Sequence, residues 1–277
     1  MSRHFTANIL LERPWDLNID AIASALRSLF PEIGEVDSIP GQSDGDDAGV
    51  LIIEGATIIV QSVRRPFPLE DLTPPLRPLR AAGADDAAAR HRAHLVISAG
   101  GALPGLEGAE AYAAVVHFVA AACLTITPAL AVFWKSGYAL ARAETFTTAA
   151  NMLLHGGMPV GTWISFATVV PTGMRPEDGM GMVTYGMRSF IGRELELAPR
   201  PCDARVAFQM ISAVCRQILN RGTQLTDGST IHSTEDGGTL RVRERDFWLR
   251  RDVSALVLVS HDSIVDSETL KARVVQA

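Results

Sequence analysis

The segment that decides the fold is the charge-free run Ala111–Trp134, AYAAVVHFVAAACLTITPALAVFW. Its 24 residues are close to the roughly 20 that a membrane-spanning helix needs. Eight alanines, an internal His117 and the helix-breaking Pro128 favour a different interpretation. We expect a buried helix over about residues 109–124, followed by a buried strand at Leu130–Trp134, in the core of a soluble protein.

Length and composition set wider limits. The chain of 277 residues is 47% hydrophobic, which is enough for a real core in one large or two ordinary domains. A net charge of −6 argues against general binding to nucleic acid or to an anionic membrane. The three cysteines do not form a disulfide framework or a zinc motif, and the first residues carry no apolar signal segment. We therefore expect a cytoplasmic protein.

The same order of elements is predicted twice. Near the N-terminus a strand is followed by a helix that Asn18 can cap, and then by a β-branched hairpin. Between Glu194 and Arg243, a strand, a helix capped by Asp203 and a hairpin follow each other again. This pattern predicts an α+β fold, a mainly antiparallel sheet with helices packed on one face, and it allows two related β-α-β-β halves.

Further elements are predicted along the chain. The expected strands are Phe5–Glu12, Val50–Ile53, Thr57–Val63, His94–Ser98, Val160–Val169, Val183–Gly186, Glu194–Leu197, Ser229–Ser233, Thr239–Arg243 and Ala255–Val259, and further helices are expected at Ala143–Leu154 and from Asp203 to Asn220. The five prolines between Pro66 and Ala89 indicate a surface connection. We thus expect an N-terminal β-α-β-β unit over 1–65, a connection over 66–90, and a C-terminal α+β unit over 91–277 that can pack with the first.

Several motif-like patterns fail a test of spacing or context. The glycine-rich turn at residues 98–108 lacks a phosphate-binding pattern, and Glu107 and Glu110 would repel a phosphate there. The G-x-S-x-G letters at residues 41–45 lie in a polar loop and not between a strand and a helix. His91 and His94 lead into a strand, so we expect surface histidines and no metal site. No cofactor is predicted.

Two histidines and one cysteine are expected to serve the fold. His117 lies inside the apolar helix and is predicted to be a satisfied core histidine, and Cys123 to be buried and inert. His155 is predicted to lie at the C-terminal end of a helix.

Arginines concentrate between Arg241 and Arg251, next to Phe247 and Trp248. Such a mixture can bind a nucleic-acid strand. Neighbouring acidic residues nearly neutralise the charge, so an ion-paired strand at the surface is the favoured interpretation.

The densest unusual segment runs from Gly179 to Glu196. Its glycines permit tight turns, and Arg188, Arg193 and Glu194 could form a polar cluster with Glu196. Two interpretations stay open: a functional site, or a structural corner with paired charges.

The same segment carries a family resemblance. Thr184–Glu196, TYGMRSFIGRELE, resembles the T-x-G-M-x-x-F-G-x-x-E-[L/I]-E signature of a bacterial family of domains of unknown function, number 4261. The W-x-S-G turn at 134–137 and the aromatic strand at 163–166 are similar to that family too, and the resemblance covers roughly residues 94–260. Ile191 stands where the pattern has glycine, and Gly192 follows one place later. The resemblance implies one α+β unit but no activity and no catalytic residues.

The leading hypothesis is a non-enzymatic bacterial protein that binds a protein partner or a small ligand, in a defence or secretion system. The ligand-binding candidates are Trp134, Ser136, Trp163 and Tyr185. One alternative is a hydrolytic enzyme that uses Glu194 with Arg188 and Arg193, and another is nucleic-acid binding through the strand from Arg241 to Arg251. The sequence leaves the oligomeric state open.

Overall fold

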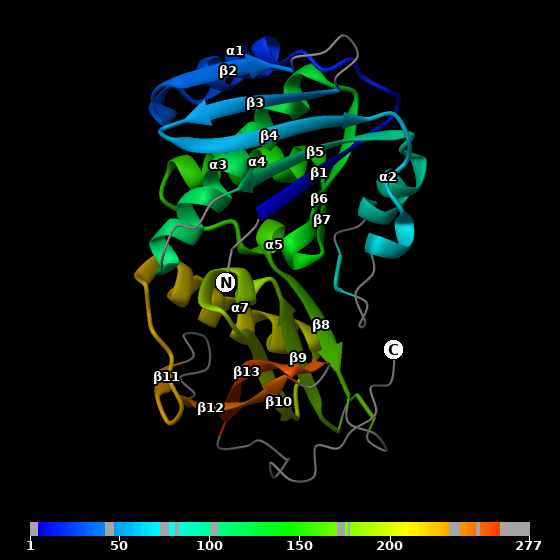
Figure 1. Cartoon of the computed structure of the whole chain (residues 1–277). Helices are drawn as coiled ribbons and strands as arrows, with labels where there is room; N and C mark the ends of the chain where they lie inside the picture. The colour runs from blue at the N-terminus through cyan, green and yellow to red at the C-terminus, as the bar shows by residue number, and fades with distance from the viewer. Residues whose placement is uncertain are drawn as a thin grey trace. The chain divides into compact units, whose positions relative to one another are not determined.

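The structure is a computed structural model. It describes residues 5–41, 47–72, 78–80, 83–100, 105–170, 175–176, 178–232, 239–247 and 250–260. The chain divides into two compact units, and each contains one β-sheet (Figure 1). Unit 1 comprises Met1–Leu72 and Arg80–Trp163, and unit 2 comprises Thr73–Leu79 and Ile164–Ala277. The α+β class predicted from the sequence is confirmed.

Unit 1 is built on a seven-stranded sheet in the order β2-β3-β4-β5-β1-β6-β7. Its strands are β1 (Phe5–Leu11), β2 (Val36–Pro40), β3 (Ala48–Ile53), β4 (Ala56–Val63), β5 (Ala93–Gly100), β6 (Ala129–Trp134) and β7 (Ala139–Arg142). All six strand pairs are antiparallel. The edge strands β2 and β7 were not predicted, because neither short segment has a run of β-branched residues.

The boundary between the units differs from the one expected near residue 90. Strand β5, which follows the connection, pairs with β1 on one side and with β4 on the other. The segment after residue 90 therefore completes the N-terminal sheet, and the division falls after Trp163.

Three helices cover one face of this sheet, here called the inner face, which carries Ala7, Val60 and Trp134. They are α1 (Ile19–Leu29), α3 (Gly105–Ile126) and α4 (Ala143–Leu154). Helix α1 lies so close to β3 that a Cβ on Gly49 would come within 3.0 Å of Ile19. From α4, the ring of Phe146 lies 6.4 Å from that of Trp134.

Helix α3 and strand β6 correspond to the charge-free run. The helix is buried on all sides from Val116 to Cys123, and Pro128 separates it from β6 as predicted. Among the described helices, α3 is the one long and apolar enough to cross a membrane. Of its most apolar stretch of 18 residues, 56% is buried inside the protein.

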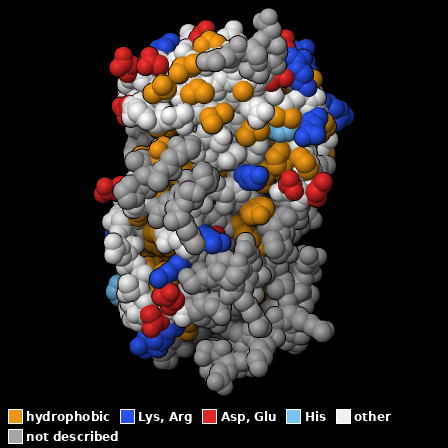
Figure 2. Space-filling view, viewed as in Figure 1, with side chains coloured by type: hydrophobic (Ala, Val, Ile, Leu, Met, Phe, Trp, Pro, Cys, Tyr) orange, Lys and Arg blue, Asp and Glu red, His pale blue; other side chains and the backbone are white. Residues whose placement is uncertain are grey.

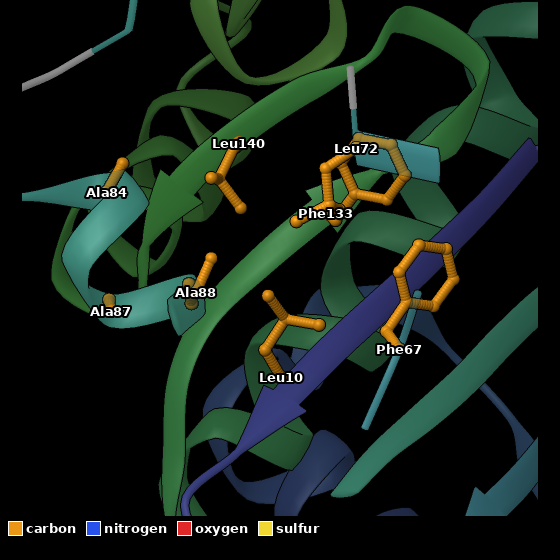
Figure 3. Packing of buried hydrophobic residues seen from close by; sticks show 9 residues of the cluster. Leu10, Phe67, Leu72, Ala84, Ala87, Ala88, Phe133 and Leu140 are labelled. Atoms are coloured by element: carbon orange, nitrogen blue, oxygen red, sulfur yellow. The ribbon is translucent and has the colours of Figure 1, made fainter. Parts of the chain in front are cut away.

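The connection over 66–90 includes regular structure that was not predicted, in the part that the structure describes. It contains the short helix α2 (Ala84–Arg90), whose alanines Ala84, Ala87 and Ala88 pack with Phe67, Leu10 and Phe133 (Figure 3). Leu10 and Phe133 point to the face opposite Trp134, because side chains alternate along a strand. We call this the outer face. These buried residues of the connection thus cover the outer face over β1, β6 and β7, whereas Leu79 of the connection is exposed.

His91 and His94 are buried, at 2% and 6% exposure, so the prediction of surface histidines was wrong. His91 accepts a hydrogen bond from the Phe67 amide at Nε2, 2.7 Å away, and its Nδ1 is hydrogen-bonded to the Ala88 carbonyl. His94 Nδ1 donates to the Arg65 carbonyl at 2.9 Å. The two rings hold the start of the connection on the sheet, a role that their spacing could not reveal.

Unit 2 is built on a six-stranded sheet in the order β11-β12-β13-β10-β9-β8. Its strands are β8 (Ser165–Val169), β9 (Met180–Tyr185), β10 (Glu194–Arg200), β11 (Thr230–His232), β12 (Thr239–Phe247) and β13 (Arg250–Ser260). Its one parallel pair joins β10 to β13. Helix α7 (Ala204–Arg221) packs on β9 and β10, and Asp203 caps it by accepting the Val206 amide at 2.8 Å, as predicted.

The strand expected over Val160–Val169 is shorter than predicted. Its first residues form the one-turn helix α5 (Val160–Trp163), and the strand β8 begins only at Ser165. Apolar and β-branched residues are common to both segments, so composition alone did not separate them.

Candidate functional site

The glycine-rich segment folds into a tight corner between β9 and β10. Its centre is the short helix α6 (Met187–Ile191), with Gly186 at φ 120° before it and Gly192 at φ 80° after it. The Gly192 amide donates to the Arg188 carbonyl at 2.9 Å. A left-handed residue is needed to end this turn, and glycine adopts that conformation without strain. The glycine one place later than in the family pattern therefore still ends the helix.

Glu194 is the centre of this corner. Its carboxylate accepts hydrogen bonds from the backbone amides of Gly186 and Met187, at 2.9 and 3.1 Å, and from the Thr184 hydroxyl at 2.8 Å. The side chain is 7% exposed. Glu194 thus satisfies amides at the start of α6 that the helix itself leaves without acceptors.

Burial raises the pKa of Glu194 to about 7, although the hydrogen bonds from Gly186 and Thr184 oppose that rise. The carboxylate also acts on α7, because burial and the negative charge of Glu194 raise the pKa of the Cys215 thiol. Glu194 therefore lies between α6 and α7 in the interior of unit 2, and a raised pKa there follows from burial.

Of the two arginines predicted to act with Glu194, Arg188 reaches the carboxylate through its backbone amide, and neither guanidinium charge contributes to the shift of the Glu194 pKa. Arg193 forms an ion pair with Glu244 of β12, with 2.7 Å between Nη1 and Oε2. Arg188 is half-buried on α6, where its carbonyl takes the Gly192 amide. Glu196 is buried two residues further along β10, at 2% exposure. This geometry favours the structural corner over the hydrolytic cluster.

The ligand-binding candidates lie in different places. Trp134 and Trp163 meet in unit 1 with their rings stacked, 5.9 Å apart at 25°, and both are fully buried. Ser136 lies in the 3-10 turn Lys135–Gly137 that follows β6. Tyr185 ends β9 in unit 2 and is 7% exposed. The two tryptophans form a core cluster and present no ring face to a ligand.

His117 organises that cluster. The indole Nε1 of Trp163 donates to Nδ1 of His117 at 3.0 Å, and Nε2 of His117 donates to the Phe146 carbonyl at 3.1 Å. The imidazole stacks on Phe146 at 3.8 Å, and burial lowers its pKa to about 3. The prediction of a satisfied core histidine is confirmed. Its partner Trp163 lies 46 residues away in the sequence, so no local pattern could identify it.

The arginine-rich strand carries ion pairs where it is described. Arg241 and Arg243 are exposed on β12, and Arg243 lies 3.9 Å from Asp227. With the pair between Arg193 and Glu244, the described part of this surface carries both signs of charge, as expected for an ion-paired strand. The side chains of Arg245, Phe247, Arg250 and Arg251, and Trp248 as a whole, lie outside the described residues.

The remaining candidate motifs are only partly described. The G-x-S-x-G loop after Gly41 and residues 101–104 of the glycine-rich turn lie outside the described residues. Glu107 and Glu110 are on α3, and burial together with the charge of Glu107 raises the pKa of Glu110 to about 7. Among the residues that the structure describes, no group of three or more His, Cys, Asp or Glu side chains could hold a metal ion. Cys123 is buried, which raises the pKa of its thiol to about 12.

Comparison with known proteins agrees with the geometry of the corner. The model of one family, "Domain of unknown function (DUF4261)", matches residues 183–256, from β9 to β13. This segment belongs to the DUF4261 family. The family resemblance seen in the sequence is thereby confirmed, and no curated protein and no solved structure matches the chain.

The DUF4261 segment contains the whole corner around Glu194 and α6. The signature residues Thr184, Gly186 and Glu194, and Gly192 one place after the glycine position of the pattern, each have a role in folding that corner: hydrogen bonding for the polar pair, turn geometry for the glycines. These four residues therefore have structural roles in this chain.

Proposed function

We propose that the protein is a non-enzymatic binding protein and that its ligand is another protein. One observation carries this proposal: part of the outer face of the unit 1 sheet is exposed, apolar and almost free of charge. Ile39 and Ile59 there are each 46% exposed. Apolar patches on otherwise polar surfaces are typical of protein–protein contacts.

The burial of the two side chains best suited to acid–base chemistry, Glu194 and His117, supports the same proposal. Glu194 caps α6, and His117 is locked between Trp163 and Phe146. A hydrolase needs such a group at a surface that the substrate can reach. In the described part of the chain these two groups are buried instead. A cytoplasmic location and a bacterial origin remain predictions from the sequence.

The test is photo-cross-linking in full-length protein. A photoreactive phenylalanine analogue at Ile59 is expected to give a protein adduct of one defined mass, and the substitution Ile39→Arg on the neighbouring strand is expected to abolish it. The control places the analogue at Thr145, which is exposed on α4 over the inner face. Equal labelling from both positions, or an adduct unaffected by Ile39→Arg, would contradict the proposal.

A further inference from the structure

The hydroxyl group of Thr184 has two acceptors within reach in the corner around Glu194. Its Oγ1 lies 2.8 Å from Oε2 of Glu194 and 3.3 Å from the carbonyl oxygen of Leu195, and it accepts the Leu195 amide at 2.8 Å. The Thr184 side chain is fully buried, so water does not compete for these bonds. A hydroxyl group donates one hydrogen bond and accepts two. It can therefore turn from one acceptor to the other and keep the Leu195 amide.

The described hydrogen bonds to the Glu194 carboxylate all come from donors. Thr184 donates to Oε2, and the backbone amides of Gly186 and Met187 donate to Oε1 and Oε2, at 2.9 and 3.1 Å. A backbone amide group cannot accept a hydrogen bond, whereas a hydroxyl oxygen can. When the carboxyl group takes up a proton, Thr184 Oγ1 is therefore the partner that accepts its O–H.

Protonation of Glu194 on Oε2 reverses one hydrogen bond. The carboxyl O–H then donates to Thr184 Oγ1 across the same 2.8 Å, an ordinary length for an O–H···O bond in either direction. The Thr184 hydrogen turns to the Leu195 carbonyl, and the Gly186 amide keeps its acceptor Oε1. One proton enters from solvent, and the new donor has an acceptor. The buried groups stay paired in both states, so neither state carries the cost of an unsatisfied polar group.

The charges near Glu194 leave this exchange to burial and hydrogen bonding. Burial raises the pKa of Glu194 to about 7, and the hydrogen bonds to its charged form oppose that rise. The guanidinium groups of Arg188 and Arg193 do not contribute to this pKa, and neither does Glu196, which is buried two residues further along β10. Both charge states of Glu194 are therefore accessible near neutral pH.

The other elements around Glu194 do not add a charge beside it. On α7, burial and the negative charge of Glu194 raise the pKa of the Cys215 thiol, which therefore stays neutral. Strand β13 places Ala255 beside Glu194, and β9 contributes Thr184. A proton taken up here thus changes the charge of Glu194 alone.

We propose that Thr184 and Glu194 form a proton-binding pair, in which the carboxyl group takes up or releases one proton while the Thr184 hydroxyl reverses its hydrogen bond and the corner stays closed. Thr184 acts as a positioning residue, because it turns its hydroxyl group to suit either charge of its neighbour. The inference goes beyond the proposed binding function and does not depend on it. The exposed apolar part of the outer face, where Figure 2 shows hydrophobic side chains gathered, lies in unit 1.

Carbon-13 NMR of the full chain tests the inference, from about pH 4 to about pH 9. The carboxyl carbon of Glu194 reports its charge, and the carbonyl carbon of Leu195 reports the hydrogen bond from Thr184. In the wild type both signals are expected to change with one midpoint, near pH 7. In Thr184→Val the Glu194 signal should still titrate, but the change at Leu195 should be several-fold smaller. Thr184→Ser should restore it.

Thr162→Val is the matched control, because the Thr162 hydroxyl is also buried but donates to the Pro159 carbonyl, at 3.0 Å. This variant is expected to titrate as the wild type does. An equal change at Leu195 in the wild type and in Thr184→Val would report only the field of the nearby charge and would overturn the inference. A Glu194 carboxyl group that keeps one charge over the whole range would overturn it too.

Hydrogen exchange in the wild type tests the closed corner without any substitution. The Gly192 amide donates to the Arg188 carbonyl at 2.9 Å and ends α6. After correction for the intrinsic pH dependence of exchange, its protection is expected to be the same below and above the Glu194 midpoint. Loss of this protection when Glu194 changes its charge would mean that the corner opens, and would contradict the proposed pair.

Discussion

Each unit buries a titratable group at the centre of a hydrogen-bonded cluster, and these two groups, His117 and Glu194, prefer opposite changes in charge. In unit 1, burial lowers the pKa of His117 to about 3, so the imidazole stays neutral. In unit 2, burial raises the pKa of Glu194 to about 7, so its carboxyl group stays protonated at higher pH than an exposed glutamate does. The physical cause is the same, because loss of water disfavours a charge of either sign. Acid therefore destabilises unit 1 and favours unit 2.

The units also differ in what they leave at the surface. The DUF4261 segment lies in unit 2, where its polar signature residues are buried in the fold. The exposed apolar residues Ile39 and Ile59 lie in unit 1, outside that segment. A signature rich in polar residues can thus describe a structural corner, while the surface suited to binding has no motif at all.

The largest expected effect is the acid sensitivity of unit 1. The pKa of His117 is lowered on folding, so the stability it contributes is present above pH 6.5 and is lost as the pH falls toward 3. At about 1.4 kcal/mol per pKa unit, the full loss is about 5 kcal/mol. The measurement is the free energy of unfolding of unit 1, from hydrogen exchange, for the wild type and for His117→Phe, which cannot titrate. A difference between them that does not change with pH would contradict the assignment.

Removing the imidazole at neutral pH is expected to have a similar effect. His117→Ala leaves a cavity beside Phe146 and takes the hydrogen-bond partner from Trp163, which together cost about 3–5 kcal/mol. Denaturant unfolding followed by tryptophan fluorescence measures this loss. His155→Ala, at an exposed position just after α4, is the matched control and should change stability by less than about 0.5 kcal/mol.

The opposite pH dependence is expected in unit 2. The pKa of Glu194 is raised on folding, so its contribution is fully present below pH 4.5 and is lost as the pH rises toward 7, by about 3 kcal/mol. The non-titrating Glu194→Gln variant provides the reference. Hydrogen exchange in unit 2 should show the advantage of the wild type over this variant shrinking between pH 4.5 and 7. An advantage that grows over this range would show that the carboxylate is stabilised when charged.

The smallest expected effect is the same in both units. Asn18 caps α1 by accepting the Ala21 amide at 2.9 Å, and Asp203 caps α7 by accepting the Val206 amide at 2.8 Å. Asn18→Ala and Asp203→Ala should each cost about 1 kcal/mol, as measured by denaturant unfolding. A loss of stability of more than about 2 kcal/mol in only one of the two variants would mean that the substituted side chain has a further role.

The sequence predicted the parts of the fold that depend on neighbouring residues. The caps at Asn18 and Asp203, helix α4 and the break at Pro128 all depend on local signals and were confirmed. The order strand, helix, hairpin was also present in both units, and in unit 1 the unpredicted strand β2 lies between the helix and the hairpin.

Contacts between distant segments could not be predicted. Strand β5 pairs with the distant strands β1 and β4. The hydrogen bonds from Trp163 to His117 and from Phe67 to His91 likewise join residues that are far apart in the sequence. The corner around Glu194 was identified as unusual, but its structural role followed only from the amides that its carboxylate accepts. The exposed apolar surface around Ile39 and Ile59 was missed, because a patch formed by residues on different strands has no continuous sequence pattern.

The central claim is that the buried polar groups serve the fold while the exposed apolar part of the outer face around Ile39 and Ile59 provides binding. Photo-cross-linking from residue 59 of the full chain, compared with the same experiment in Glu194→Gln and in Ile39→Arg under conditions where all three proteins are folded, tests it most directly. We predict that Glu194→Gln leaves the protein adduct intact and that Ile39→Arg abolishes it. Loss of the adduct in Glu194→Gln, with the adduct intact in Ile39→Arg, would contradict the claim.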